Sequence, residues 1–530
     1  MLEKCVGGEE NFQSGEKATH DTVGHGTAVA GCAAYGDIER CIEEKRFAAA
    51  NWIFSAKVMY AEADGFGGEV RAAYDPEKLV EHQLKGAVES FVSNPDYHIR
   101  VVNISLGNSN EVWHKHYQRQ LPLAALIDEL AQTYPFVSFI VSAGNNNPRN
   151  DHDSIRAIVD NYPKYLLGDE FKITNPATAA LAMTVGSVVP LVRQHLSTYG
   201  GEQIKTPIAD EQGKPSPFSR TGPGINGMIK PEVVEYGGNT ILYSNHGRII
   251  EDVGGKIAVL DNQTTGNLVR FDAGTSFAAP KVAHTAGQIA NVFPQRSANF
   301  VNNMLLVGAQ RLFEPDKEFY GSTDNDKALE AHLSVSGYGV PDFERAIRSF
   351  DNRVVLFDEG QIGLNQIKVY TLQIPDIFFA ESGRKKITAV LTLNPETRSS
   401  RGDSYLGNTM EFHLFHSVNP QVLVEKYGVI TEETETQGVP EELKNFEILM
   451  QPGSNTRKKG CHQKAWKNYK REPKSRPSAP LSLVLLNFKK WIETADYKQD
   501  YCISVIFEHE KEIQLYNAVR TVIQTRARVR

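Results

Sequence analysis

The chain has 530 residues, more than one typical domain, so two or three domains are expected. Hydrophobic residues make up 41% and charged residues 23%, as in an ordinary soluble globular protein, and the net charge of −7 argues against a chain that binds polyanions over its whole surface. The five cysteines are scattered, which favours reduced thiols over a disulfide scaffold or a zinc site. We find neither a secretory signal nor an apolar run of about 18 residues, and therefore expect a cytoplasmic protein without membrane contact.

Up to about residue 350, short apolar runs alternate with amphipathic segments. The predicted strands are 53–60, 100–106, 136–142 and 182–188, and the predicted helices are 78–92, 119–134, 276–291 and 298–312. Strands rich in Val and Ile that alternate with helices of this length predict an α/β domain, with a doubly wound parallel sheet covered on both faces.

Beyond residue 350 the pattern changes to strands with little helix between them. The predicted strands there are 367–374, 386–393, 410–415, 481–486 and 503–509. They indicate a β-sandwich appended to the α/β domain, so we place one domain at 1–350 and a β-rich accessory domain at 351–530. Residues 450–479 are rich in Lys, Arg, Pro, Gly and Ser, and we interpret them as an exposed loop.

Three separated strings each allow a structural and a chemical interpretation. The first is "GHGTAVAG" (24–31), in which glycines flank His25 and small residues follow it, a pattern that also suits a helix packed closely on a sheet. The second is "FIVSAGNNN" (139–147), an apolar strand that ends at Gly144 and Asn145, where a side-chain amide could donate to a developing oxyanion. A simple Gly-Asn turn would explain the second string equally well.

The third string is "GTSFAAP" (274–280), in which Ser276 stands at the start of a helix. A serine there is easily explained as a helix cap. The chemical interpretation places its hydroxyl at the positive end of the helix, with its own backbone N–H free to bind an oxyanion. Pro280 is tolerated because amides of the first helical turn lack helical partners in any case.

Together and in this order, the three strings resemble the subtilisin-like serine proteases, and the resemblance covers about residues 20–350. It implies that His25 is the general base, that Ser276 is the nucleophile, and that Asn145 helps to bind the oxyanion of an acyl-transfer reaction. "VVNISLG" (101–107) and "KVMYAEADGFGGEV" (57–70) are similar to the two walls of the family's substrate cleft. The resemblance therefore assigns substrate binding to Ser105, Leu106 and Gly107 on one wall and to Gly67 and Gly68 on the other.

The family's catalytic aspartate lies in an Asp-Ser/Thr-Gly string that ends an early strand, and no such string precedes His25. Asp21 is the nearest carboxylate, but it is a common companion of the histidine box, and four residues before His25 it is badly placed to reach the far ring nitrogen. Two explanations stay open: a chain that lacks its natural beginning, or a catalytically inert scaffold that binds peptides or a partner. Because the first strand of a doubly wound sheet is usually central, we favour the first explanation and expect impaired activity of the chain as given.

The accessory domain resembles that of a bacterial subtilase group encoded beside AAA-type ATPases, which implies such an ATPase as a partner. The resemblance rests on "GYGVPDFERAI" (337–347), "MEFHLFH" (410–416) and "LYNAVRTVIQTRARVR" (515–530). The basic stretch 457–474 could bind nucleic acid, but without regular aromatic residues a solvated loop is the better interpretation. No cofactor is expected; "NNNPRNDHD" (145–153) has enough oxygens for calcium, but a polar loop is the simpler explanation.

Overall fold

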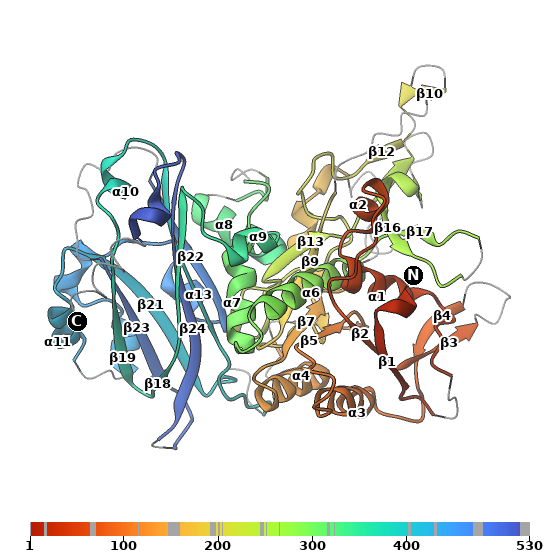
Figure 1. Cartoon of the computed structure of the whole chain (residues 1–530), viewed down its shortest axis with the longest axis horizontal. Coiled ribbons are helices and arrows are strands. Elements are labelled where there is room, and N and C mark those ends of the chain that lie inside the picture. The colour runs from red at the N-terminus through yellow and green to blue at the C-terminus, as the bar shows by residue number, and fades with distance from the viewer. Residues whose placement is uncertain are drawn as a thin grey trace.

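The computed structural model describes most of the chain, and all structural statements below concern these residues: 2–14, 18–63, 70–114, 116–117, 119–146, 159–190, 198–199, 202–203, 205–243, 248–250, 252–263, 266–314, 319–322, 324–400, 404–428, 432–469, 481–494 and 496–519. Two bodies lie side by side, an α/β part that ends near α9 (Phe343–Ile347) and a β-rich part that follows it (Figure 1).

Four parallel strands form the sheet of the α/β part, in the order β13-β9-β7-β5. They span Val233–Tyr236, Met183–Val188, Ser138–Ser142 and Val101–Ile104. Every residue of β7 and β9 is buried, as expected of inner strands covered by helices on both faces. The α/β class and the parallel sheet predicted from the alternation of strands and helices are confirmed.

A second, two-stranded parallel sheet lies beyond β5 and consists of β1 (Val6–Asn11) and β2 (Ile53–Lys57). The strand predicted at 53–60 divides into β2 and β3 (Met59–Ala63), and β3 forms an antiparallel hairpin with β4 (Val70–Tyr74). β1 was not predicted from the sequence, because its two glycines and two glutamates are poor strand formers.

Helices cover both faces of the parallel strands (Figure 1). α6 (Thr275–Val292) contacts β5, β7, β9 and β13 on one face and packs against α1 (His25–Tyr35), whereas α3 (Val80–Val92) and α4 (Pro122–Thr133) lie together on the other side. α7 (Ala298–Gly308) is shorter than the helix predicted at 298–312, because Gln310 leaves the helix to exchange two backbone hydrogen bonds with Val340.

Two antiparallel sheets form the C-terminal part. One has the order β18-β24-β20-β22, with spans Arg353–Gly363, Lys498–His509, Lys385–Leu393 and His462–Tyr469; the other has the order β19-β23-β21, with spans Gln366–Leu372, Leu481–Lys489 and Asn408–His416. The predicted exposed loop at 450–479 is wrong for 462–469: β22 pairs with β20, and its first five residues are buried. The many polar residues of "HQKAWKNY" hide this strand, because Gln463 and Lys464 are buried and hydrogen bond to other parts of the chain.

α7 joins the two bodies, since it contacts β7 on one side and β20, β22 and β24 on the other. One apolar cluster includes Ala278 of α6, Leu305 of α7 and Ile506 of β24, so the core is continuous across residue 350. The placement of a domain boundary at residue 350 stays a prediction.

The remaining α-helices and strands, apart from the 12-residue α8, have eight residues or fewer. They are α2 (Ile38–Glu43), β6 (Asn108–Val112), β8 (Thr174–Asn175), β10 (Thr198–Tyr199), β11 (Glu202–Gln203), β12 (Lys205–Pro207), β14 (Ile241–Tyr243), β15 (Arg248–Ile250), β16 (Ile257–Leu260), β17 (Val269–Asp272), α8 (Asn325–Ser336), α10 (Ile377–Ala380), α11 (Pro420–Tyr427), α12 (Glu432–Gln437) and α13 (Ser454–Arg457). Among the described helices, none has the length and apolar character needed to cross a membrane.

Candidate active site

The carboxyl ends of the parallel strands bring together three of the residues that the sequence motifs single out. Asn145 follows β7, while His25 and Ser276 stand at the starts of α1 and α6, two helices that pack against each other. Ser105, Leu106 and Gly107 directly follow β5 at the same end. This end of a parallel sheet is where α/β folds place their ligands.

His25 is half-buried at the first position of α1. Its Nε2 lies 3.3 Å from the carbonyl oxygen of Ser105, and its ring lies 5.5 Å from that of Phe277, measured between centroids. Gly24 precedes it with a φ of 86°, a left-handed conformation that explains why glycine stands before the histidine. Among the described residues, no carboxylate forms an ion pair or hydrogen bond with His25.

The carboxylate of Asp21 accepts hydrogen bonds from the backbone that leads into α1. Its Oδ2 accepts from the N–H of Thr27 at 2.7 Å, and its Oδ1 accepts from the N–H groups of Val23 and Gly24. Partial burial alone would raise the pKa of Asp21, but the hydrogen bonds from Thr27 and Gly24 hold that pKa below its ordinary value. Asp21 therefore caps α1 and is not directed at the imidazole.

Ser276 lies in the first turn of α6, and Pro280 stands four residues after it. Because proline has no N–H, the carbonyl of Ser276 lacks its usual helical donor. The hydroxyl of Ser105 takes that place and donates to the carbonyl oxygen of Ser276 at 2.9 Å. This hydrogen bond ties the segment after β5 to the start of α6.

Asn145 is exposed, and its orientation is fixed by Thr275. The Oδ1 of Asn145 accepts from the backbone N–H of Thr275 at 2.9 Å and from the Thr275 hydroxyl at 3.0 Å. The same hydroxyl accepts from the N–H of Gly144 at 3.2 Å. The oxygen of Asn145 is used, and its amide N–H groups, which donate to no described residue, can serve a ligand. Thr275 therefore fixes the orientation of the Asn145 side chain. In the sequence, the only indication of this role is that Thr275 stands next to Ser276.

The two expected walls of a substrate cleft are described to different extents. Ser105 and Leu106 are half-buried, and Gly107 is exposed. A Cβ added at Gly107 would lie only 3.1 Å from the carbonyl oxygen of Asn175, so a larger residue would be crowded there. Gly67 and Gly68 lie outside the described residues, as do residues 147–153 of the string considered for calcium. In the described ranges, no group of three His, Cys, Asp or Glu residues is arranged to hold a metal ion.

The two parallel sheets approach each other beside His25. Among the described strands, β5 and β2 are each paired on one side only, and a cavity of about 1430 Å³ lies between them. Its lining includes His25, all of β2 and all of β5. We call this cavity, bounded by Ile53–Lys57 and Val101–Ile104, the slot.

Comparisons with known proteins show what this chain is similar to. A family model described as "Subtilase family" matches residues 4–339. An uncharacterized protein of Sinorhizobium fredii, y4bN, is 32% identical over 436 residues, which cover 81% of this chain and 96% of that protein. The serine protease AprX of Bacillus subtilis is 22% identical over 336 residues, 63% of each chain. A solved lanthipeptide protease, 18% identical, has a TM-score of 0.36 over 65% of this chain and 81% of its own.

Proposed function

The chain belongs to the subtilase family, and from that premise we propose that it is a serine endopeptidase that hydrolyses peptide bonds through an acyl-enzyme. The observation that carries this proposal is the meeting of His25, Ser276 and Asn145 at one end of the sheet. These residue types can supply a base, a nucleophile and an oxyanion donor.

In the proposed reaction His25 removes the proton from the Ser276 hydroxyl as that oxygen attacks the peptide carbonyl. His25 then returns the proton to the leaving amine, and water releases the acyl group by the same route. The carbonyl of Ser105, 3.3 Å from His25 Nε2, can only accept a hydrogen bond. The imidazole must therefore carry its proton on Nδ1 and release this contact before Nε2 can take the proton of Ser276.

The oxyanion of the tetrahedral intermediate would be bound by Asn145 Nδ2 and the backbone N–H of Ser276. Both donors are fixed before substrate arrives, Asn145 by Thr275 and the Ser276 N–H by its place in the first turn of α6. Donors that are held in advance stabilise charge without a reorganisation cost. The reaction itself requires no metal or organic cofactor.

The substrate would lie as an extended strand along Ser105, Leu106 and Gly107, with Gly67 and Gly68 expected on its other side.

We also propose a cytoplasmic location. The described cysteines are all free thiols, as in proteins of a reducing compartment.

A second candidate function is favoured by the absence, among the described residues, of a carboxylate beside His25. A scaffold without turnover would bind peptides, or an AAA-type ATPase through residues 351–530. In subtilisin, loss of the triad acid alone lowers turnover about 3 × 10⁴-fold, so a chain with only His25 and Ser276 would retain little activity.

Labelling with a serine-directed fluorophosphonate probe separates the two candidates. A peptidase is expected to react at Ser276, slowly but measurably, and the reaction should disappear in Ser276→Ala and in His25→Ala. Peptide mapping of the labelled protein identifies the modified residue. Labelling that persists in both variants, or never occurs at Ser276, would exclude the peptidase and leave the scaffold.

A further inference from the structure

Basic side chains gather where the sheet of β20, β22 and β24 meets α7 and α9 (Figure 1). We call them the interface cluster: Arg311, Arg345, Arg353, Lys386 and Lys464. Three carboxylates act on this cluster: Glu314, Asp342 and Glu508. The basic groups therefore outnumber the acidic ones at an interface from which water is largely excluded.

Pairing across the strands fixes how the cluster is arranged. Arg353 of β18 pairs with Glu508 of β24, and Glu508 pairs in turn with Lys386 of β20. Residues paired directly across neighbouring strands project from the same face of a sheet. Trp466 of β22 pairs with Thr388, two residues after Lys386, and so lies on that face as well. One row of side chains therefore carries two cations with a single carboxylate between them.

Lys386 stands between two partly exposed arginines of the cluster. Its Nζ lies 5.9 Å from the centroid of the Trp466 ring, over which the guanidinium of Arg311 packs at 4.4 Å. Glu508, its neighbour across the strands, forms an ion pair with Arg345. The ring contacts and the ion pair therefore hold both arginines close to Lys386.

Several donors of the interface cluster have no acceptor. Among the described residues, none forms a hydrogen bond or ion pair with Lys386 Nζ, and Lys386 is half-buried. The Nε atoms of Arg345 and Arg353 are buried without a hydrogen-bond partner. Because buried donors without acceptors are costly, an anion at this place would be stabilised by groups that are already in position.

The cations of the cluster also disfavour one another's charge. Burial lowers the pKa of Lys386, whereas Glu508 raises it. The charges of Arg311 and Arg345 lower the pKa of Lys386 further. Burial, with a contribution from Arg345, lowers the pKa of Arg353 to about 10. A bound anion would offset this repulsion, which is strong where water is scarce.

We propose that the interface cluster binds a compact anion of the phosphate class, such as pyrophosphate, through Lys386, Arg311 and Arg345. The guanidinium groups offer paired N–H donors and the ammonium a point charge, a combination that suits phosphoryl oxygens. Arg345 and Arg311 keep 27% and 14% of their side-chain surface exposed, so a small anion can reach them from solvent. Trp466 is only 4% exposed, which leaves no ring face for a base, so the anionic group itself would be recognised.

Binding at this place would connect the two bodies. Arg311 and Arg345 belong to the α/β part, whereas Lys386 belongs to the sandwich. A ligand held from both sides would therefore raise the stability of the whole chain. This role is independent of the proposed peptidase reaction.

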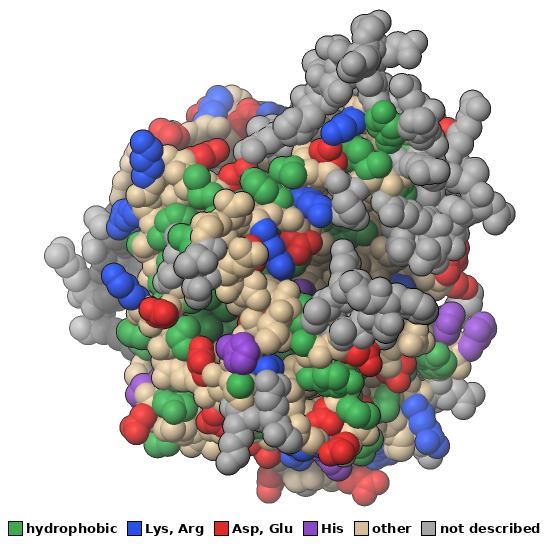
Figure 2. Space-filling view, turned by 90° about the vertical axis from the view of Figure 1, so that its right-hand side faces the viewer, with side chains coloured by type: hydrophobic (Ala, Val, Ile, Leu, Met, Phe, Trp, Pro, Cys, Tyr) green, Lys and Arg blue, Asp and Glu red, His purple; other side chains and the backbone are tan. Residues whose placement is uncertain are grey.

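The excess of positive charge is local to the interface cluster. On the face that carries α1, β3 and β4, acidic, basic and apolar side chains are interspersed among the described residues (Figure 2). The whole chain has a net charge of −7. Binding of an anion would therefore reflect the cluster and not a general attraction to the surface.

Calorimetric titration of the full chain with pyrophosphate tests the proposal. The ionic strength is kept constant with sodium chloride, so that a change in screening does not imitate binding. We expect saturable binding at one site and a rise of the unfolding midpoint with pyrophosphate concentration. Sodium chloride at the same ionic strength should not reproduce this rise.

Variants of Lys386 locate the site. Lys386→Met keeps the apolar stem and should weaken binding about tenfold or more, as expected for one lost charge-assisted hydrogen bond. Lys386→Arg keeps the charge and should retain most of the affinity. The matched control is Lys498→Met, which removes the same charge from an exposed position at the opposite end of β24 from Glu508, about 30 Å away. This control should bind pyrophosphate like the parent.

Stability without ligand separates binding from packing. Because Lys386→Met removes a repelling charge, its unfolding midpoint without pyrophosphate should equal or exceed that of the parent. A midpoint clearly below that of Lys498→Met would make any loss of binding a result of damaged packing and would overturn the proposal. Absence of saturable binding by the parent, an equal rise of the midpoint with sodium chloride, unchanged affinity in Lys386→Met, or equal weakening in both Met variants would also overturn it.

Discussion

At the scale of single residues, Asn145 has the clearest chemical assignment, because its oxygen is occupied and its amide group is not. Asn145→Ala should slow fluorophosphonate labelling of Ser276 about 10²–10³-fold, the usual cost of one lost oxyanion donor. The unfolding midpoint should fall modestly, since the N–H and hydroxyl of the buried Thr275 lose their acceptor. An unchanged labelling rate would show that Asn145 does not face the reacting centre.

Thr275 is expected to act through Asn145. Thr275→Val removes the hydroxyl that links Asn145 Oδ1 to the N–H of Gly144, while Thr275→Ser retains it. One such hydrogen bond is worth about 1 kcal/mol, so Thr275→Val should slow labelling several-fold to about tenfold. Restoration of the rate by Thr275→Ser would identify the hydroxyl as the cause, and equal loss in both variants would point to packing instead.

Asp21 should affect stability more than chemistry. Asp21→Ala removes the acceptor for the N–H of Thr27 and should lower the free energy of unfolding by about 1 kcal/mol, as for other helix caps. Since the pKa of Asp21 is lowered in the folded chain, its contribution is present above the ordinary pKa and is lost as the pH falls through the folded value. Urea unfolding of both proteins at pH 7 and near pH 3 should therefore show a difference that shrinks in acid, and a constant difference would contradict this account.

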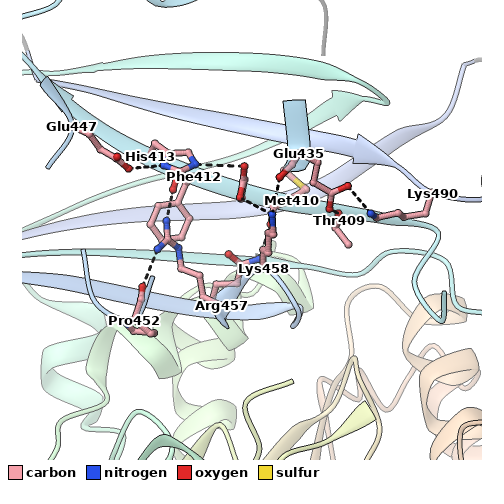
Figure 3. A network of polar contacts seen from close by, with 12 residues as sticks. Thr409, Met410, Phe412, His413, Glu435, Glu447, Pro452, Arg457, Lys458 and Lys490 are labelled. Carbon is pink, nitrogen blue, oxygen red and sulfur yellow. Dashed lines mark hydrogen bonds and ion pairs between the residues drawn. The ribbon is translucent and has the colours of Figure 1, made fainter. Parts of the chain in front are cut away.

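At the scale of elements, a buried polar network joins β21 to the segment before β22 (Figure 3). His413 Nδ1 lies 2.7 Å from Glu447 Oε1 and its Nε2 lies 3.5 Å from Glu411 Oε1, while Lys458 Nζ is 3.6 Å from the other oxygen of Glu411. Arg457 stacks on Phe412, with 4.3 Å to the ring centroid. Protonation of His413 would place a positive charge between these two buried carboxylates.

This network predicts a loss of stability on the alkaline side. Burial alone would lower the pKa of His413, but Glu411 and Glu447 raise it above its ordinary value. A raised folded pKa contributes stability that is complete below about pH 6.5 and disappears as the pH rises through the folded value. The urea midpoint should therefore fall between pH 6 and pH 9 more in the parent than in His413→Gln, and parallel curves would contradict the assignment.

The elements that the sequence predicted well are those with continuous apolar runs, such as β7 and β9. β22 was missed because Lys464 and Gln463 are buried, with their side-chain nitrogens bonded to carbonyls elsewhere in the chain, a tertiary arrangement that composition alone cannot reveal. The motif residues His25, Asn145 and Ser276 were singled out by three strings whose order resembles the family, and their roles stay predictions. The slot could not be located from the sequence, since the edges of β2 and β5 become visible only when both sheets are placed.

At the scale of the whole molecule, the two bodies share one apolar core and a set of buried polar contacts through α7. Lys464 of β22 donates to the carbonyls of Leu306 and Ala309, at 2.7 and 2.6 Å, and thereby satisfies the end of α7. Asn303 of α7 donates to the carbonyls of Val390 and Cys502 at 3.2 and 3.0 Å. Helix α7 is therefore a structural part of both bodies.

We therefore expect the chain to unfold as one unit, and the catalytic part to depend on the sandwich. A fragment of residues 1–350 would expose the face of α7 that contacts β20, β22 and β24, and should aggregate or bind a hydrophobic dye. In the full chain, Lys464→Met keeps the apolar stem but removes the Lys464 donor from the carbonyl of Ala309, while the carbonyl of Leu306 keeps the N–H of Ala309. The expected cost is about 1–3 kcal/mol. Calorimetry should show a single transition that moves to lower temperature in this variant. Two results would contradict this expectation and show that the α/β part is stable without the sandwich. One is a soluble monomeric fragment that melts at the temperature of the full chain; the other is a Lys464→Met variant in which only one of two transitions moves.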